Sequence, residues 1–187
     1  MRFRGSKADM LSMKWLLVVL LALPVTAGRA EAEAGCGIVF GNDWAFAFSA
    51  PAQWAAQCRT ETTAGAALRL WPRETTFADA PVSMTVTVRE KNPRSLALFA
   101  ADEQQRFRSG KPNVTVRFEP GFPVGGGAAG LVFRATDERN HEFIAYVEGP
   151  TRFFVVVMSA RTAESLEAHR ADFKSLLNSF VPMKVKS

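Results

Sequence analysis

Few side chains in this sequence could carry out acid–base, nucleophilic or metal chemistry. The chain contains two histidines, His141 and His169, and no G-x-S-x-G pattern. This argues against a site of several imidazoles, and His141 beside Glu142 offers only one imidazole with neighbouring carboxylates. We expect no catalytic residue, no metal and no cofactor. The alternative is an unrecognised hydrolase that uses His141 or His169, because catalytic triads assemble in space rather than in sequence.

A glycine-rich stretch has the spacing of a dinucleotide-binding loop. Gly125, Gly127 and Gly130 match G-x-G-x-x-G. That motif requires a strand before it and a helix after it, whereas here a proline-rich segment precedes and a strand-like run follows. The composition instead predicts a loop over residues 120–130. A lid over a bound small molecule is the alternative.

Arg69, Trp71 and Arg73 form an arginine–aromatic–arginine stripe at alternate positions. They would share one face if the predicted strand continued past Pro72, with the leucines between them turned to the core. Such side chains bind anionic or aromatic groups through charge and cation–π contacts, and they anchor many protein interfaces. We predict that this stripe is an interaction surface. The alternative is a tryptophan packed under a loop and flanked by solvated arginines.

Residues 1–34 have the pattern of a secretory signal peptide. Four basic residues against one acidic residue precede an apolar run over residues 15–27, which is shorter than the about 20 residues that cross a bilayer. Small residues favour cleavage after Ala34, and Met10 or Met13 is an alternative start. We therefore expect an exported, periplasmic domain over residues 35–187. An uncleaved anchor is the alternative.

Export changes how the only two cysteines are interpreted. Cys36 and Cys58 both lie near the start of the expected mature domain. In an oxidising compartment a disulfide is the ordinary state of such a pair, and no C-x-x-C motif indicates redox activity. We therefore predict a Cys36–Cys58 disulfide. Two reduced, buried thiols are the alternative.

Composition and charge exclude several classes of protein. Hydrophobic residues make up 48% and charged residues 22% of the chain, which excludes a disordered chain and a coiled coil. The formal net charge is +5, and part of that surplus belongs to residues 1–34. The remaining domain is not basic enough for a nucleic-acid binder, and we expect no membrane insertion after cleavage.

Hydrophobic patterning predicts an α+β domain, with helices packed on a mainly antiparallel sheet. Residues 82–88 alternate apolar and polar, as in a strand with one buried face, whereas residues 153–158 are apolar throughout, as in a central strand. Helical stripes follow N-cap candidates at Asn92-Pro93 and Thr162. Further strands are predicted over residues 44–48, 66–71, 114–118, 131–137 and 143–147, and a turn or short helix at Gln53-Trp54.

Three segments resemble PsbP-like proteins. Phe46–Trp54 is similar to the opening of that family, an apolar strand followed by Pro, two residues and Trp. Ala145–Glu148 with Phe153–Val157, and then Ser175–Phe180, resemble its closing hairpin and final helix. The fold is shared with Mog-type proteins and with bacterial periplasmic relatives such as DcrB. The resemblance implies an α/β/α sandwich and an accessory, binding role, and it carries no catalytic residues.

Together these features predict an exported accessory protein of the bacterial cell envelope that docks onto a protein partner. The arginine–tryptophan stripe is the predicted contact. A periplasmic protein that binds a small ligand between helix and sheet is the alternative.

Overall fold

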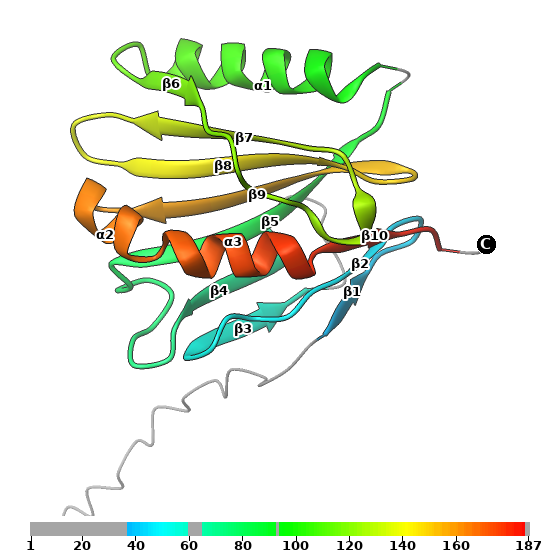
Figure 1. Cartoon of the computed structure of the whole chain (residues 1–187), viewed down its shortest axis with the longest axis horizontal. Coiled ribbons are helices and arrows are strands. Elements are labelled where there is room, and N and C mark those ends of the chain that lie inside the picture. Colours follow the sequence, from blue (N-terminus) through cyan, green and yellow to red (C-terminus); the bar gives the residue numbers. More distant parts are fainter. Residues whose placement is uncertain (1–36, 60–64, 93, 186–187) are drawn as a thin grey trace, which may run out of the picture. The chain divides into compact units, whose positions relative to one another are not determined.

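A seven-stranded antiparallel sheet lies at the centre of the fold (Figure 1). The computed structural model describes residues 37–59, 65–92 and 94–185. The predicted leader and Cys36 lie outside these residues, so the signal peptide, its boundary and the disulfide stay predictions. In spatial order the strands are β3 (Trp54–Cys58), β4 (Leu68–Pro72), β5 (Val82–Glu90), β9 (Arg152–Ala160), β8 (His141–Glu148), β7 (Gly130–Thr136) and β6 (Thr115–Phe118).

The two strands with the clearest sequence patterns lie side by side in the middle of this sheet. In β5, Val82, Met84 and Val86 are buried, whereas Ser83 and Thr85 between them are half-exposed. β9 is apolar at nearly every position and lies between β5 and β8, where both of its faces are covered. Both strand predictions are confirmed. Side chains of neighbouring strand residues point to opposite faces, so an alternating strand buries one face and a continuously apolar strand buries both.

One helix, α1 (Leu96–Gly110), packs on one face of the sheet over β7 and β8. The Phe99 ring stacks on Phe153 with centroids 4.3 Å apart. The helix begins later than predicted: Ser95, not Asn92, is the N-cap, and its hydroxyl accepts a hydrogen bond from the Leu98 backbone N–H. The predicted apolar stripe is otherwise confirmed.

Two helices, α2 (Ala163–Ala168) and α3 (Arg170–Ser179), cover the other face. The predicted N-cap is confirmed, since the Thr162 hydroxyl accepts a hydrogen bond from the Ser165 backbone N–H at 3.1 Å. The single helix expected here is instead broken at His169. Helices therefore lie on both faces of an antiparallel sheet, and the predicted α+β class is confirmed.

A second, three-stranded antiparallel sheet has the order β1-β2-β10. Phe46 on β2 joins it to the main core: its ring stacks on Phe180 at 4.7 Å and meets Phe154 edge-on at 5.5 Å. The predicted strand over residues 44–48 is confirmed in its centre. The strands are β1 (Ile38–Phe40), β2 (Ala45–Ala47) and β10 (Val181–Met183).

The patterns did not predict β1, β3 or β10. The turn expected at Gln53-Trp54 is correct for Gln53, which has a φ of 66°, but wrong for Trp54, which begins β3. These strands are three to five residues long. Such short segments give too few positions for an alternating pattern to be seen.

The predicted glycine-rich loop packs closely against its surroundings. It contains a short 3₁₀ turn, η1 (Gly125–Gly127), which contacts α3 and β10. Gly125 is buried, and a Cβ there would overlap the backbone oxygen of Asn178. Gly126 has a φ of 64° and lies against Val181. This segment holds α3 in place, and its packing favours a fixed connection over the alternative of a ligand lid.

Arg170 on α3 links the chain that follows β6 to the helices α2 and α3. Its guanidinium donates to Glu119, in the chain just after β6, at 2.9 Å and to Glu167 on α2 at 2.7 Å. It also lies 4.7 Å from the centroid of the Phe143 ring on β8. Arg134 on β7 pairs with Glu167 as well. The Arg170 guanidinium, by donating to Glu167, holds the pKa of that carboxyl below its ordinary value.

Replacing Arg170 with leucine is expected to lower the free energy of unfolding by about 1 kcal/mol at pH 7, because the charges are partly solvated. The pKa of Glu167 is lower in the folded than in the unfolded chain. The contribution of Glu167 to the free energy of unfolding is therefore present above its unfolded pKa and is lost as the pH falls through its folded pKa. Urea unfolding from pH 7 to pH 3 should therefore show the difference between wild type and variant shrinking below about pH 4.5. A difference that stays constant over this range would contradict the assignment.

Candidate functional site

On one face of the seven-stranded sheet, α1 packs on one half and leaves the other half without a helix from the described residues over it. The face that carries Arg69 and Thr85 continues through Val157 to Ile144, whose side chain belongs to the core under α1. Figure 1 shows α1 beside β6 and β7, at the other end of the sheet from β3 and β4. The outward side chains on β4 and β5 are accordingly half-exposed. We call this region the open face; its members are Gln57, Arg69, Trp71, Phe77, Ser83, Thr85 and Thr87.

Three side chains of the open face form one stacked cluster. Arg69 and Trp71 project to the same side of β4, because the buried Leu68 and Leu70 take the alternate positions. Phe77, from the connection between β4 and β5, meets the Trp71 ring edge-on with centroids 5.8 Å apart. The Arg69 guanidinium carbon lies 4.9 Å from the centroid of the Phe77 ring.

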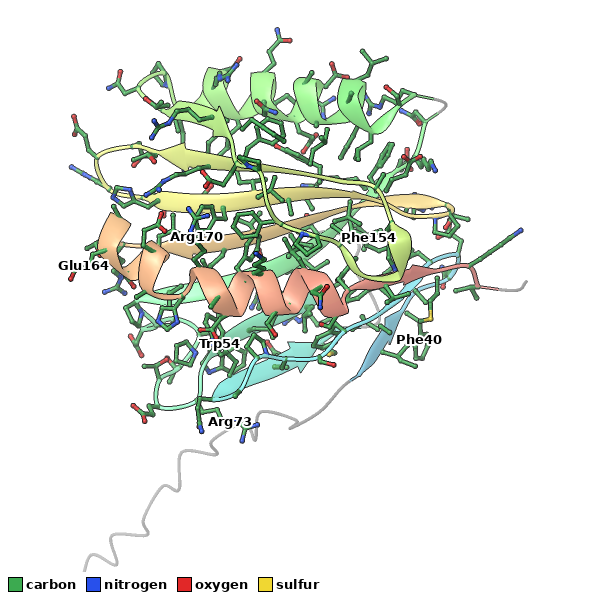
Figure 2. The ribbon with its side chains drawn as sticks, viewed as in Figure 1. Phe40, Trp54, Arg73, Phe154, Glu164 and Arg170 are labelled. Atoms are coloured by element: carbon green, nitrogen blue, oxygen red, sulfur yellow. The ribbon has the colours of Figure 1, made fainter. Side chains whose placement is uncertain are left out.

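Arg73 does not belong to this cluster. The strand ends at Pro72, and Arg73 turns back to β3, where its backbone N–H donates to Gln53 O at 2.9 Å. Its Nε donates to the carbonyl oxygen of Trp54 at 3.2 Å. Figure 2 shows Arg73 and Trp54 at the β3 end of the sheet. The condition set for Arg73, that the strand continue past Pro72, is therefore not met.

Phe77 is the member that sequence patterning missed. It lies in a polar connection, where no strand or helix period marks it, and only its aromatic character distinguishes it from its neighbours. Among the described residues, no carboxylate lies within 4.0 Å of the Arg69 guanidinium. The cluster thus combines a half-exposed cation with two rings that are already ordered against each other, a combination common at the centre of interfaces.

The two histidines have different surroundings. His169 Nδ1 lies 2.8 Å from Asp172 Oδ2, and the Trp54 Nε1–H donates to the same oxygen at 3.2 Å. His141 begins β8 and is half-buried, and its Nδ1 has no hydrogen-bond partner among the described residues. The Trp54 contact assigns Asp172 to holding α3 against β3. This hydrogen bond joins two elements that are far apart in the sequence, as expected of a structural hydrogen bond.

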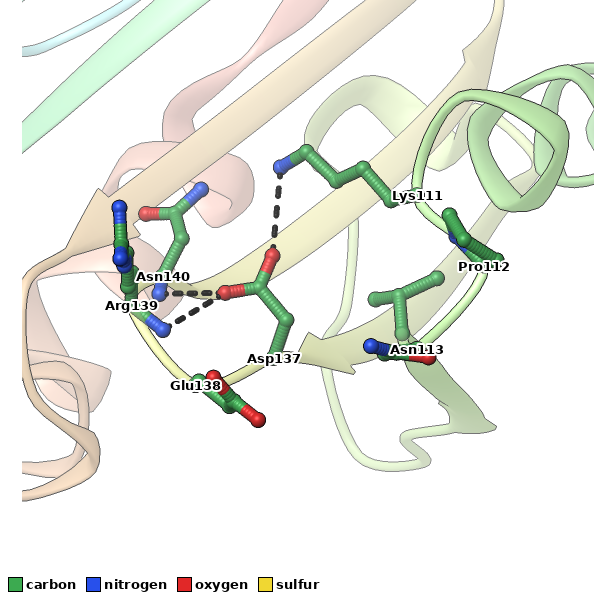
Figure 3. A pocket seen from close by; sticks show the side chains of 8 residues that line it. Lys111, Pro112, Asn113, Asp137, Glu138, Arg139 and Asn140 are labelled. Atoms are coloured by element: carbon green, nitrogen blue, oxygen red, sulfur yellow. Dashed lines mark hydrogen bonds and ion pairs between the residues drawn. The ribbon is translucent and has the colours of Figure 1, made fainter.

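A pocket of about 460 Å³ lies where the end of α1 meets the turn between β7 and β8 (Figure 3). Asp137 accepts hydrogen bonds from the backbone N–H groups of Arg139 and Asn140, at 2.8 and 2.7 Å, and lies 3.7 Å from Lys111 Nζ. The bond from Arg139 lowers the pKa of Asp137. The pocket is lined by this turn and by residues 111–114, and the glycine-rich loop is not part of its lining.

Within residues 37–59, 65–92 and 94–185, no group of three or more His, Cys, Asp or Glu side chains could hold a metal ion. No helix in these ranges is long and apolar enough to cross a membrane.

Comparisons with known proteins return a likeness of fold. No family model matches the chain, and no curated protein matches it. The structure is similar to the solution structure of cyanobacterial PsbP (CyanoP) from Synechocystis sp. PCC 6803, with 12% sequence identity and a TM-score of 0.47. That match covers 72% of this chain and 85% of the other.

Proposed function

We propose that this protein is a non-catalytic accessory protein of the bacterial cell envelope, which docks onto a protein partner through the open face. The Arg69–Phe77–Trp71 cluster is the observation that supports the proposal. It places a cation and two rings on a part of the sheet where the side chains are half-exposed. Trp, Tyr and Arg are the residue types that most often dominate binding energy at protein interfaces.

The arrangement suits docking for a physical reason. Phe77 fixes both neighbours before any partner arrives, so less side-chain freedom is lost on binding. The hydroxyls of Ser83, Thr85 and Thr87 flank the cluster on β5 and can form hydrogen bonds at the rim. The partner surface that fits best presents a carboxylate opposite Arg69 and a flat apolar or aromatic group opposite Trp71.

Partner capture with variants tests the proposal. The full-length chain with a C-terminal tag is crosslinked in intact host cells, and the proteins that copurify are quantified by mass spectrometry. We expect Trp71→Ala and Arg69→Glu each to lower recovery of one dominant envelope protein by about tenfold or more. Lys174→Glu makes the same charge change on an exposed residue of α3, on the opposite face, and should leave recovery unchanged.

Two outcomes would count against docking at this face. Equal recovery with Trp71→Ala and wild type would show that the cluster is not the contact. A small molecule recovered with the natively purified chain, lost with Lys111→Ala but not with Trp71→Ala, would favour ligand binding in the pocket at the end of α1 instead. Circular dichroism of each variant excludes loss of folding as the cause.

We also propose that the domain over residues 35–187 is periplasmic after cleavage behind Ala34, and that Cys36 and Cys58 are joined. The basic residues and short apolar run of the leader support export, and the oxidising compartment supports the disulfide. The intact mass of the purified chain, before and after reduction and alkylation, measures both. An N-terminus other than Gly35, or alkylation without prior reduction, would contradict the corresponding proposal.

A further inference from the structure

The outer face of the small sheet is apolar at every outward position. On β1, Ile38 is 57% and Phe40 56% exposed, while Val39 between them is buried. On the far strand, β10, Val181 and Met183 lie on the same outer face and are half-buried. The β2 positions between them are alanines. This face therefore presents no charged or polar side chain on the three strands.

Among the described residues, no strand pairs with the outer edge of β1. Gly41 N–H donates to Trp44 O at 2.8 Å, and Phe48 N–H donates to Gly37 O at 2.9 Å. Hydrogen-bonded pairs alternate along an antiparallel ladder, so Val39 bonds to β2. The N–H and C=O groups of Ile38 and Phe40 consequently point away from β2. Since the sheet order is β1-β2-β10, they face the outer edge of the sheet.

The other sheet edges in the described residues carry features that oppose pairing. Pro182 at the middle of β10 has no N–H to donate on its outer side. In β3, Ala55 and Ala56 are buried, so that edge is already covered. In β6, symmetric pairing of two copies would place the exposed Arg117 opposite itself, and like charges directly opposite are destabilising. Within the part of the chain that the structure describes, β1 has none of these protections.

We infer that β1 pairs with β1 of a second copy of this chain, antiparallel and centred on Val39. In that register Ile38 of each copy lies opposite Phe40 of the other, and both residues have their main-chain groups turned to the new partner. Each such pair exchanges its hydrogen bonds and brings two exposed apolar side chains together, and no charge meets a like charge. The edge is therefore complementary to itself, which a two-fold symmetric dimer requires.

The contact area sets the expected strength. Three residues of strand and the apolar face beside them supply well under the about 800 Å² that each partner buries in a stable interface. We therefore expect a dimer that forms and dissociates with concentration. This inference does not depend on docking at the open face, which lies on the larger sheet.

Sedimentation equilibrium of the purified chain over a concentration series tests the inference. The average mass of the wild-type chain should rise with concentration toward twice that of the monomer. Phe40→Lys should weaken association by about tenfold or more. Phe118→Lys is the matched control, because Phe118 is 58% exposed and lies on a different edge strand, β6. It should associate as the wild type does.

A charge-pair experiment tests the register. A mixture of Ile38→Lys with Phe40→Glu should recover the dimer, since the introduced lysine of one copy faces the introduced glutamate of the other. A mixture of Ile38→Lys with Ile38→Glu should not, because those positions are not opposite each other. A wild-type chain that stays monomeric, a loss of association with Phe118→Lys equal to that with Phe40→Lys, or equal recovery in both mixtures would overturn the inference.

Discussion

Replacing Phe46 with alanine is expected to lower the free energy of unfolding by about 4 kcal/mol, as for other buried aromatic side chains. The Phe46 ring is fully buried and packs against the rings of Phe154 and Phe180. Its removal takes away the contacts that hold β2 on β9 and the end of α3, and it leaves a cavity that rigid neighbours cannot fill. Urea unfolding followed by circular dichroism measures the change.

Phe118→Ala is the matched control for this prediction. Phe118 is 58% exposed on the edge strand β6, so little apolar surface is returned to water by truncating it. We expect a change of about 0.5 kcal/mol or less. Similar losses for the two variants would show that the small sheet is not part of the main core.

The second large effect is expected from Gly125→Ala, which should lower the free energy of unfolding by about 3 kcal/mol. The added methyl group would overlap the backbone oxygen of Asn178, and its carbon would lie 3.0 Å from the backbone oxygen of Phe180. Backbone atoms at a helix end cannot move aside as the tip of a flexible side chain can. Either η1 must separate from α3 or the end of α3 must shift. Thermal and urea unfolding of the variant measure the loss.

Gly110→Ala provides the comparison for a methyl group added without a clash. Gly110 ends α1, and a Cβ there would meet nothing within 4 Å. This variant should be as stable as the wild type or slightly more so, since alanine favours the helix. If Gly125→Ala were equally harmless, the glycine-rich segment would be free to move, and the alternative of a ligand lid would regain support.

Elements with a long, clear period could be predicted from the sequence. β5 alternates from Val82 to Val88 and β9 is apolar at nearly every position, so local patterning and final burial agree. The break between α2 and α3 could not be predicted, because the apolar stripe continues past His169 without a glycine or proline to mark it. The pairing of β1 and β10 with β2 depends on contacts between the two ends of the described chain, which no local pattern contains.

In the candidate site, too, only what lies within one strand could be predicted from the sequence. Arg69 and Trp71 share a face because both lie within β4, where alternation determines direction. Arg73 lies beyond Pro72, and its position is set by hydrogen bonds to residues 53 and 54. That Phe77 covers the space between Arg69 and Trp71, and that α1 packs on the other half of the sheet, are properties of the assembled fold.

Site-specific photo-crosslinking in the native host tests docking at the open face most directly. A photoreactive amino acid is placed at Thr85, beside Arg69 on the open face, or at Lys174 on the opposite side of the molecule. We expect the probe at Thr85 to capture one envelope protein, Trp71→Ala in the same chain to abolish this capture, and the probe at Lys174 to capture none of it. Capture of the same protein from Lys174 but not from Thr85 would contradict docking at the open face.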